Sequence, residues 1–369
     1  MPEVLDLFTE LAAIPSPSGE ERAVADVVSA YLRDCALEVD EDDAGARIGA
    51  TAGNLYTRLE PTAPGTPIFL CAHLDTVPPT GRIEPVVDDE DVVRNAAGTI
   101  LGADDKAAVA VMLDATRRVL AERRPQAGIE LLFTPKEEVG LIGAAAFDES
   151  RLTARHGFVY DQAAPIGEIV LGAPHSQSLE ATFHGKASHA GMYPEEGRNA
   201  IVAAARAVAD LRLGQVDEYS TANVGVIHGG VASNIVPEHC MFVAEARSHD
   251  ERRLADLVQE MMESISFAAE MSDCRADIES RKSYRGYRFK RDDEVVRFAA
   301  DALARAGQDV RFGLSGGAAD ANVFNERGLQ CLNLANGMKD IHTPDERIAV
   351  ADLDAMVDVT LALVDAALA

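Results

Sequence analysis

The feature that most constrains this chain is a set of short, mainly apolar runs that are each followed at once by histidine or acidic residues. The runs are 68–72, 129–133 and 158–160, and a segment rich in Ala, Val and Leu fills 105–121 between the first two. Runs of this length, bounded by polar residues, indicate buried β-strands, and the longer segment indicates a helix. Buried strands that alternate with helices are typical of an α/β domain with a mostly parallel sheet.

The polar residues that follow these runs form the first candidate site. His73 and Asp75 follow the first run, Glu137 and Glu138 follow the second, and Asp161 follows the third. In open α/β sheets, ligands bind outside the carboxyl ends of the strands. We therefore expect these side chains to converge although they are far apart in the sequence.

Two further residues extend this group to a metal-ligand set. Asp104 directly precedes the helical segment, and His342 follows the apolar run 329–334 and a loop. Imidazole and carboxylate ligands suit zinc, manganese or cobalt. Two divalent ions ~3.5–4 Å apart can share a water and clamp a reacting carbonyl. The predicted ligands of two such ions, most simply zinc, are His73, Asp104, Glu138, Asp161 and His342.

Two acidic residues of the group remain for other tasks. Asp75 lies two residues beyond His73, where it could accept the second imidazole N–H and fix the tautomer. Glu137 could take a proton from the attacking water and pass it to the leaving amine. Adjacent residues of an extended segment point to opposite sides, so Glu137 and Glu138 can divide these roles.

The middle of the chain follows a different pattern. Between residues 178 and 286 we predict the order β-α-β-β-α-β, which is the ferredoxin-like arrangement. The predicted elements are strand 178–184, helix 198–213, strands 222–228 and 238–247, helix 251–270 and strand 275–283. We expect a larger α/β domain of residues 1–177 and 287–369, into which a smaller α+β domain of residues 178–286 is inserted.

The N-terminal region carries a helix signal of another kind. Residues 3–14 have helical apolar spacing, and Ser18 and Glu21 have the spacing of a capping box. The capping box predicts a second helix that ends near residue 34.

Charge and cysteine content exclude several classes of function. The 34 Lys and Arg residues against 61 Asp and Glu give a net charge of −27, which disfavours nucleic acid and anionic membranes as partners. Five cysteines without a CxxC pair argue against a disulfide framework or a thiolate zinc site. No signal peptide or apolar run of ~20 residues is present. We therefore expect a cytoplasmic protein.

The separated motifs together resemble the signature set of the M20 metallopeptidases, and most closely its peptidase T-like (tripeptide aminopeptidase) branch. The similarity extends from Pro15 to Glu346, and the motifs occur in the family's order. They are His73–Asp75, Gly102–Lys106, Glu137–Gly140, Asp161, Gly185–Gly191, Gly229–Pro237, Ser315–Asn322 and Ile341–Thr343.

The resemblance implies a role for each ligand. Asp104 would bridge two metal ions, His73 and Asp161 would complete one ion, and Glu138 and His342 would complete the other. The family spacing favours Asp104 over its neighbour Asp105 as the bridge. It also implies that Glu137 is the general base, and that the peptide bond after the bridging aspartate is cis.

The resemblance implies that residues 1–177 and 287–369 form the metal-binding catalytic domain and that the inserted domain is a lid or dimerisation domain, in which it points to three residues. His189 would stabilise the oxyanion, in its own site or in that of a partner subunit, although its sequence context also suits a simple turn. Arg247 would hold a substrate carboxylate, or else pair with Asp250. Asn234 would contact substrate, or cap a local turn.

The residues predict a two-metal hydrolase, and the resemblance implies an exopeptidase for short peptides, most simply a tripeptide aminopeptidase that could form a homodimer through the lid. An N-acyl-amino-acid deacylase, carboxypeptidase or dipeptidase would use the same metal centre and differ in the lid contacts. A metal-dependent peptide-binding protein without turnover is an alternative of another class. The presence of Glu137 argues against it, because a binding protein needs ligands but no base.

Overall fold

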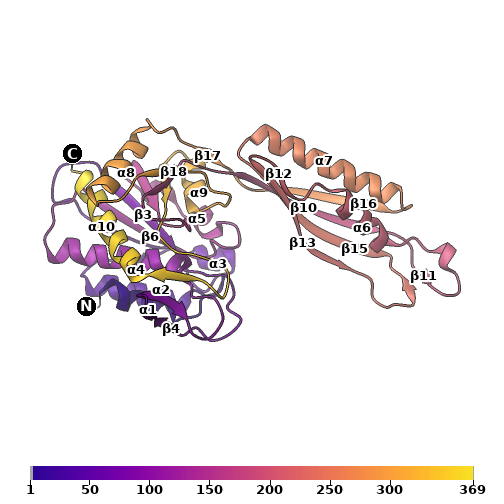
Figure 1. Cartoon of the computed structure of the whole chain (residues 1–369), viewed down its shortest axis with the longest axis horizontal. Coiled ribbons are helices and arrows are strands. Elements are labelled where there is room, and N and C mark those ends of the chain that lie inside the picture. The colour runs from indigo at the N-terminus through magenta and orange to yellow at the C-terminus, as the bar shows by residue number, and fades with distance from the viewer. Residues whose placement is uncertain (1–2, 369) are drawn as a thin grey trace. The chain divides into compact units, whose positions relative to one another are not determined.

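The structure is a computed structural model that describes residues 3–368. The chain divides into two compact units, with boundaries after residues 173 and 287. These boundaries differ slightly from the expected ones at 177 and 286. The first unit consists of the chain before and after the insertion, and the second unit is the insertion itself (Figure 1). The predicted fold class, an α/β domain with an inserted α+β domain, is confirmed.

The first unit is built on an eight-stranded sheet with the order β1-β2-β6-β3-β7-β19-β8-β18. Strands β6, β3, β7 and β19 are mutually parallel and form its centre. Their carboxyl ends therefore meet at one edge of the sheet. The strands are β1 (Asp40–Glu41), β2 (Leu55–Leu59), β3 (Ile68–His73), β6 (Ile129–Thr134), β7 (His156–Val159), β8 (Glu168–Val170), β18 (Arg311–Gly313) and β19 (Gln330–Leu334).

Both faces of this sheet are covered by helices. The first face is covered by α4, against which α1, α2 and α10 pack, and the other face is covered by α9, which packs on β7 and β19. The helices are α1 (Val4–Ala12), α2 (Arg22–Asp34), α3 (Ala44–Ile48), α4 (Ala103–Ala121), α5 (Ile142–Ala146), α8 (Glu294–Arg305), α9 (Asp320–Glu326) and α10 (Val350–Ala366). A small sheet of β4 (Pro85–Val87), β5 (Val92–Asn95) and β20 (Arg347–Ala349) completes the unit.

Strand β3 shows why this arrangement forms. All six of its residues are buried. Successive side chains of a strand point to opposite faces. Ile68, Leu70 and Ala72 belong to the core shared with α4, whereas the Phe69 ring packs edge-on against Phe324 of α9, with 4.9 Å between ring centroids. An apolar run without polar alternation is therefore what a strand between two helical layers requires.

The second unit has the predicted ferredoxin-like topology. Its strands lie in the order β12-β13-β15-β10-β16, and α6 and α7 contribute to a single apolar core with them. The short pair β11–β14 lies outside this sheet. The elements are β10 (His175–His184), β11 (Ser188–His189), α6 (Ala200–Asp210), β12 (Gly214–Asp217), β13 (Ser220–Gly229), β14 (Ile235–Val236), β15 (His239–Ser248), α7 (Glu251–Glu270) and β16 (Arg275–Tyr284).

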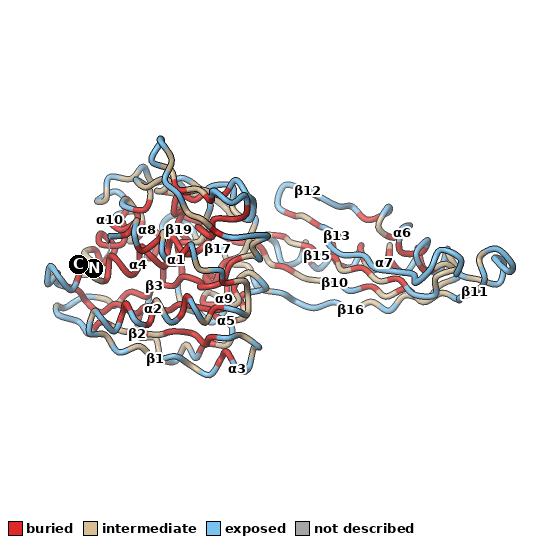
Figure 2. Tube along the Cα trace, turned by 90° about the horizontal axis from the view of Figure 1, so that it is seen from below, coloured by how far each residue is buried: buried red, intermediate tan, exposed pale blue. Residues whose placement is uncertain are grey.

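Burial differs sharply between the two sheets, as Figure 2 shows: β3 is buried along its length, whereas β16 is largely exposed. Strand β16 is an edge strand, and an exposed edge is normal for an antiparallel sheet. Among the described residues, no helix has the length and apolar character needed to cross a membrane.

Candidate metal centre

The polar residues predicted from the sequence meet at the carboxyl edge of the parallel strands. His73 is the last residue of β3, and Glu137 and Glu138 follow the end of β6. Asp161 follows β7, and Asp104 lies at the start of α4. Because β3, β6 and β7 are parallel neighbours, their carboxyl ends lie side by side. Asp104, at the start of α4, lies beside the end of β3, since its carboxylate contacts His73.

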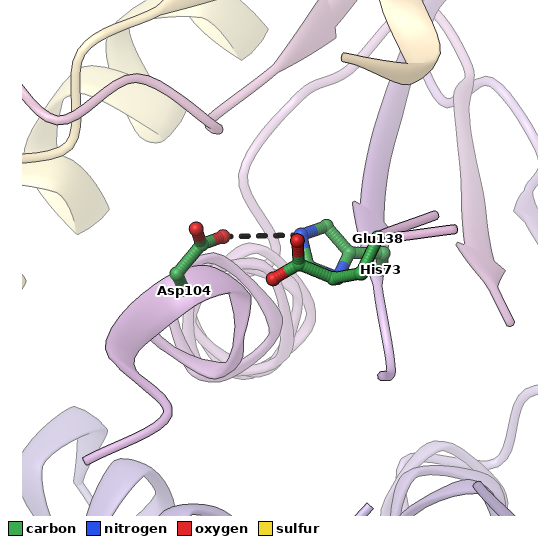
Figure 3. A group of neighbouring side chains, drawn as sticks. All are labelled: His73, Asp104 and Glu138. Carbon is green, nitrogen blue, oxygen red and sulfur yellow. Dashed lines mark hydrogen bonds and ion pairs between the residues drawn. The ribbon is translucent and has the colours of Figure 1, made fainter. Parts of the chain in front are cut away.

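Asp104 lies at the centre of the cluster. Its Oδ1 is 3.1 Å from His73 Nε2 (dashed in Figure 3), and its Oδ2 is 3.1 Å from His342 Nε2. His342 Nε2 is also 2.9 Å from Glu138 Oε1. The two carboxylate oxygens of Asp104 thus face two different imidazoles. This arrangement of donor atoms suits a carboxylate that is shared between two metal ions.

The candidate ligand atoms fall into three overlapping groups. Ligand atoms of His73, Asp104 and Glu138 lie within 4.8 Å of one another, as do those of His73, Glu137 and Asp161. A third such group contains Asp104, Asp105 and Asp161. Imidazole nitrogens and carboxylate oxygens are the ligands of zinc, manganese and cobalt sites, so the donor set fits two divalent ions.

The electrostatics of the cluster also favour cations. Burial raises the pKa of Asp161 well above its ordinary value, and the charges of Asp104 and Glu138 raise it further. Burial likewise raises the pKa of Glu137, with Asp161 among the neighbouring carboxylates that add to the effect. Carboxylates that are crowded together and removed from water repel one another. A divalent ion would relieve that repulsion.

Hydrogen bonds to neighbouring carboxylates raise the pKa values of both histidines. Hydrogen bonds to Asp104 and Glu138 raise the pKa of His342 to about 10. For His73, burial opposes protonation, but hydrogen bonds to Asp104 and Asp75 outweigh it and raise the pKa. A histidine that binds a metal must be neutral, so metal binding at neutral pH would displace protons from these rings.

Asp75 holds the segment of Glu137 and Glu138 in place. Its Oδ1 accepts the Glu137 N–H at 2.9 Å, and its Oδ2 accepts the Glu138 N–H at 3.2 Å. His73 Nδ1 lies 2.9 Å from the main-chain carbonyl oxygen of Asp75, whereas the Asp75 carboxylate is 3.5 Å away. The main-chain carbonyl, rather than the expected carboxylate, is therefore the closest partner of that ring nitrogen.

The predicted capping box at Ser18 is wrong, and its error is informative. Helix α2 begins after Glu21 and has no side-chain cap. The Ser18 hydroxyl instead donates to Asp75 Oδ2 at 2.6 Å. Ser18 thus supports Asp75, which in turn orients Glu137 and Glu138.

The peptide bond between Asp104 and Asp105 is cis, as the resemblance implied. The Oδ2 of Asp105 accepts the main-chain N–H of His73 at 3.3 Å, and a ligand atom of Asp105 still lies within 4.8 Å of those of Asp104 and Asp161.

Comparisons with known proteins agree with this geometry. Residues 172–270 match the M20 peptidase dimerisation domain, and residues 54–194 match the model of peptidase family M28. The uncharacterised protein YqjE of Bacillus subtilis is 36% identical over 364 residues, which is 99% of this chain and 98% of that protein.

Two solved structures resemble the whole chain. Aminopeptidase PepT from Bacillus cereus has 37% sequence identity and a TM-score of 0.87, with 99% of this chain and 98% of that chain covered. A tripeptidase from Staphylococcus aureus has 34% identity and a TM-score of 0.91, with 98% and 97% covered. The chain belongs to the M20 family of metallopeptidases.

The second unit of this M20 metallopeptidase carries the remaining predicted residues. His189 is exposed in β11, and its Nδ1 accepts the N–H groups of Gly191 and Met192, both at 3.2 Å. The neutral ring therefore carries its proton on Nε2, where it can donate. Asn234 is exposed and accepts the Ala190 N–H with its main-chain oxygen.

Arg247 lies in β15, and its Nη2 is 3.1 Å from Glu245 Oε1. Its predicted alternative partner was Asp250. Asp250 instead caps α7, where its carboxylate accepts the N–H groups of Arg252 and Arg253.

Sequence reasoning missed several residues that support the ligands of this M20 site. Asn333 of β19 accepts the Asp161 N–H at 2.9 Å and donates to the Asp161 carbonyl. Asp320 accepts the hydroxyl of Thr134 at 2.6 Å. Thr134 lies three residues before Glu137. Burial raises the pKa of Asp320 to about 6. Asp320 lies in a motif quoted above, but its position behind the strand ends follows only from the fold.

Proposed function

We propose that this protein is a dinuclear zinc aminopeptidase that removes residues from short peptides, most simply tripeptides. The observation that carries the proposal is Asp104, whose two carboxylate oxygens each face one imidazole, with Glu137 beside them. The similar whole-chain structures, an aminopeptidase and a tripeptidase, support a peptide substrate.

In this proposal Asp104 would hold both ions, His73 and Asp161 would hold one of them, and Glu138 and His342 would hold the other. When bound, two divalent ions polarise a carbonyl and lower the pKa of a water towards ~7. Asp75 contributes by fixing the backbone of Glu137 and Glu138 through two hydrogen bonds.

Glu137 acts as general base and then as general acid. It takes a proton from the water that attacks the peptide carbonyl and returns it to the departing nitrogen. Glu137 is only 7% exposed, and burial is the largest cause of its raised pKa. A raised pKa suits a carboxylate that must hold a proton between these two steps.

The second unit supplies substrate contacts. The Nε2–H of His189 would donate to the oxyanion of the tetrahedral intermediate, because its other ring nitrogen already accepts two backbone N–H groups. Arg247 would bind the substrate's carboxylate with its planar guanidinium. Asn234 would contact the peptide backbone.

The second unit would also form a homodimer. Strand β12 pairs with β13 only at Ser220–Ala222, and within residues 3–368 no other strand pairs with β13 on that side. The rest of β13 presents apolar residues to solvent, including Ile227, which is 49% exposed. An unpaired apolar edge is a template for another strand. In sedimentation experiments Ile227→Lys should shift a dimer to monomer, and an unchanged mass would argue against this interface.

The compartment is part of the proposal. Among the described residues no cysteine forms a disulfide, and Cys71, Cys240 and Cys331 are buried. Cysteines without disulfides suit a reducing compartment, so we propose that the enzyme acts in the cytoplasm.

A panel of tripeptides with free and blocked N-termini, assayed with added zinc, manganese or cobalt, tests the function. We expect hydrolysis of the free peptides only. Glu137→Ala should lower kcat by about 10²–10⁴-fold while both metals stay bound. Glu180→Ala, an exposed glutamate of β10, is the matched control and should retain full activity.

Each alternative has its own outcome. Faster hydrolysis of blocked peptides would indicate a deacylase. Release of the C-terminal residue would indicate a carboxypeptidase, and cleavage restricted to dipeptides would indicate a dipeptidase. Peptide binding without hydrolysis under any metal would indicate a binding protein.

A further inference from the structure

A glutamate outside the ligand set holds the backbone that carries Asp104. Glu346 is 2% exposed, and its carboxylate accepts three main-chain N–H groups. Oε2 accepts those of Leu101 at 2.8 Å and Gly102 at 2.9 Å, and Oε1 accepts that of Asp104 at 3.0 Å. All of these residues belong to the first unit.

The three N–H groups lie where a helix leaves its donors unpaired. They precede or begin α4, and the first N–H groups of a helix have no intrahelical acceptor. The local backbone is also irregular. Gly102 has φ +78°, in the left-handed region, and Asp104 has the non-helical angles φ −82° and ψ 104°. The carboxylate of Glu346 therefore does more than cap a regular helix, because it stabilises the specific bend from which the Asp104 side chain projects.

Glu346 also connects two ligand segments. It lies four residues after His342, and its own N–H donates to the Thr343 carbonyl. The next residue, Arg347, begins β20, which pairs with β5. The main chain of Glu346 is thus bonded to the segment of His342, and its carboxylate is bonded to the segment of Asp104.

We propose that Glu346 is a positioning residue of the metal centre, which fixes the Asp104 backbone so that its two carboxylate oxygens face His73 and His342. The role rests on the proposed metal site. It predicts that loss of Glu346 weakens metal binding without removing any ligand.

The first unit offers a matched control. Glu130 of β6 is fully buried, and its carboxylate also grips backbone N–H groups, those of Thr153 and Ala154. Glu130 makes the same kind of contact as Glu346. Its partners Thr153 and Ala154, however, lie seven or more residues before Asp161, the next proposed ligand along the chain. Loss of Glu130 should therefore destabilise the fold and leave metal binding intact.

The test compares Glu346→Gln, Glu346→Ala and Glu130→Gln with the wild-type protein. Zinc affinity would be measured by competition with a chromophoric chelator, and the visible spectrum of bound cobalt would report the ligand geometry. Glu346→Ala should weaken zinc binding by about 10–100-fold, the usual effect of removing a group that orients a ligand. Glu346→Gln keeps one acceptor oxygen and should fall between Glu346→Ala and wild type.

A readout without metal keeps the proposal testable on its own. In the metal-free protein, amide hydrogen exchange of the segment around Leu101–Asp104 should accelerate in Glu346→Ala and not in Glu130→Gln. Wild-type zinc affinity and cobalt spectrum in the Glu346 variants would overturn the proposal. An equal loss of zinc affinity in Glu130→Gln would also overturn it, by showing that any loss of stability has this effect.

The two proposals can fail separately. If the wild-type protein binds no zinc, the proposed function fails and this positioning role fails with it. If the wild-type protein binds zinc and hydrolyses peptides while the Glu346 variants equal it, only the role of Glu346 fails.

Discussion

The two units bury very different side chains. The second unit, all of whose residues are described, buries three polar side chains, and all three are serines: Ser176, Ser220 and Ser248. The first unit buries many charged ones: Glu21, Asp75, Asp104, Asp105, Lys106, Asp114, Glu130, Glu137, Asp320 and Glu346. A charge removed from water is costly unless it is paired. The first unit therefore retains charges that do not maximise its stability, whereas the core of the second unit is what apolar packing alone would select.

Burial of charge does not by itself mark the site. Asp114 is buried but pairs with Arg117 and Arg118, and Glu130 is satisfied by backbone N–H groups. What distinguishes the candidate metal centre is that its carboxylates crowd one another, and that Asp104 among them faces two imidazoles. Buried carboxylates of the first unit thus have two roles. Some bind arginines or backbone N–H groups, and others lie where a cation could bind.

Metal removal should affect the two units most unequally. A chelator should abolish activity, and amide exchange should accelerate around His73, Asp104 and Glu138, because a ligand that binds only the folded state stabilises it. Exchange in residues 174–287 should not change. Activity that persists in metal-free protein, or equal acceleration in both units, would contradict this separation. Re-addition of zinc is the control and should restore both properties.

Truncation of a core aromatic in each unit sharpens the comparison. Phe242 and Phe69 are both fully buried. Replacing either with alanine should cost about 3–5 kcal/mol in the free energy of unfolding. Only Phe69→Ala should also weaken zinc binding, because β3 ends at His73. Urea unfolding and chelator competition measure the two effects. Equal zinc affinity in both variants would show that the ligands tolerate changes in the sheet beneath them.

His189 tests whether the second unit contributes to the chemistry. His189→Ala should lower kcat by about 10²–10³-fold, the usual effect of losing an oxyanion donor. Zinc affinity and stability should stay at wild-type levels, since the side chain is exposed. Steady-state kinetics measure the loss, and His239→Ala, an exposed histidine of β15, is the control. A change confined to KM would assign His189 to substrate binding instead.

The smallest expected effect is a pH dependence of stability in the first unit. Burial lowers the pKa of His156, with a minor contribution from Arg155 and an opposing one from Glu294. The unfolded chain then binds a proton more readily than the folded one, so stability should fall as pH falls through this range. The variant His156→Phe, which can keep the contact with Phe298, should show a flatter dependence. Urea unfolding between about pH 8 and about pH 5.5 measures it. Parallel curves for the two proteins would show that other groups cause the decline.

The sequence predicts elements well where one local rule decides them. Helix α7 was expected at 251–270 and spans Glu251–Glu270, because it is amphipathic and begins at the capping residue Asp250. Helix α10 was not predicted. Its second half is buried all around from Val359 to Val364, whereas Leu353, Met356 and Val357 in its first half have a helical apolar spacing that could have marked it. The candidate ligands were predicted because polar residues directly follow buried strands, which is a pattern visible in one dimension, and their role as ligands stays a prediction.

The residues that support the ligands were missed for the opposite reason. Glu346 and Asp104 are 242 positions apart, and Ser18 and Asp75 are 57 apart. Ser18 also carried a plausible local explanation as a helix cap, and the tertiary contact overrode it. Nothing in either sequence context distinguishes these side chains from solvated ones, so only the fold reveals them.

The order in which the chain is synthesised adds a consequence. His342 and Glu346 lie in the segment that follows the insertion, whereas His73, Asp104, Glu138 and Asp161 lie in the segment that precedes it. A growing polypeptide on the ribosome would present four of the proposed ligands long before the fifth, His342, emerges. Chains released early, anywhere before residue 342, could not complete the catalytic centre, so a cell would be spared stray proteolysis by its own unfinished products.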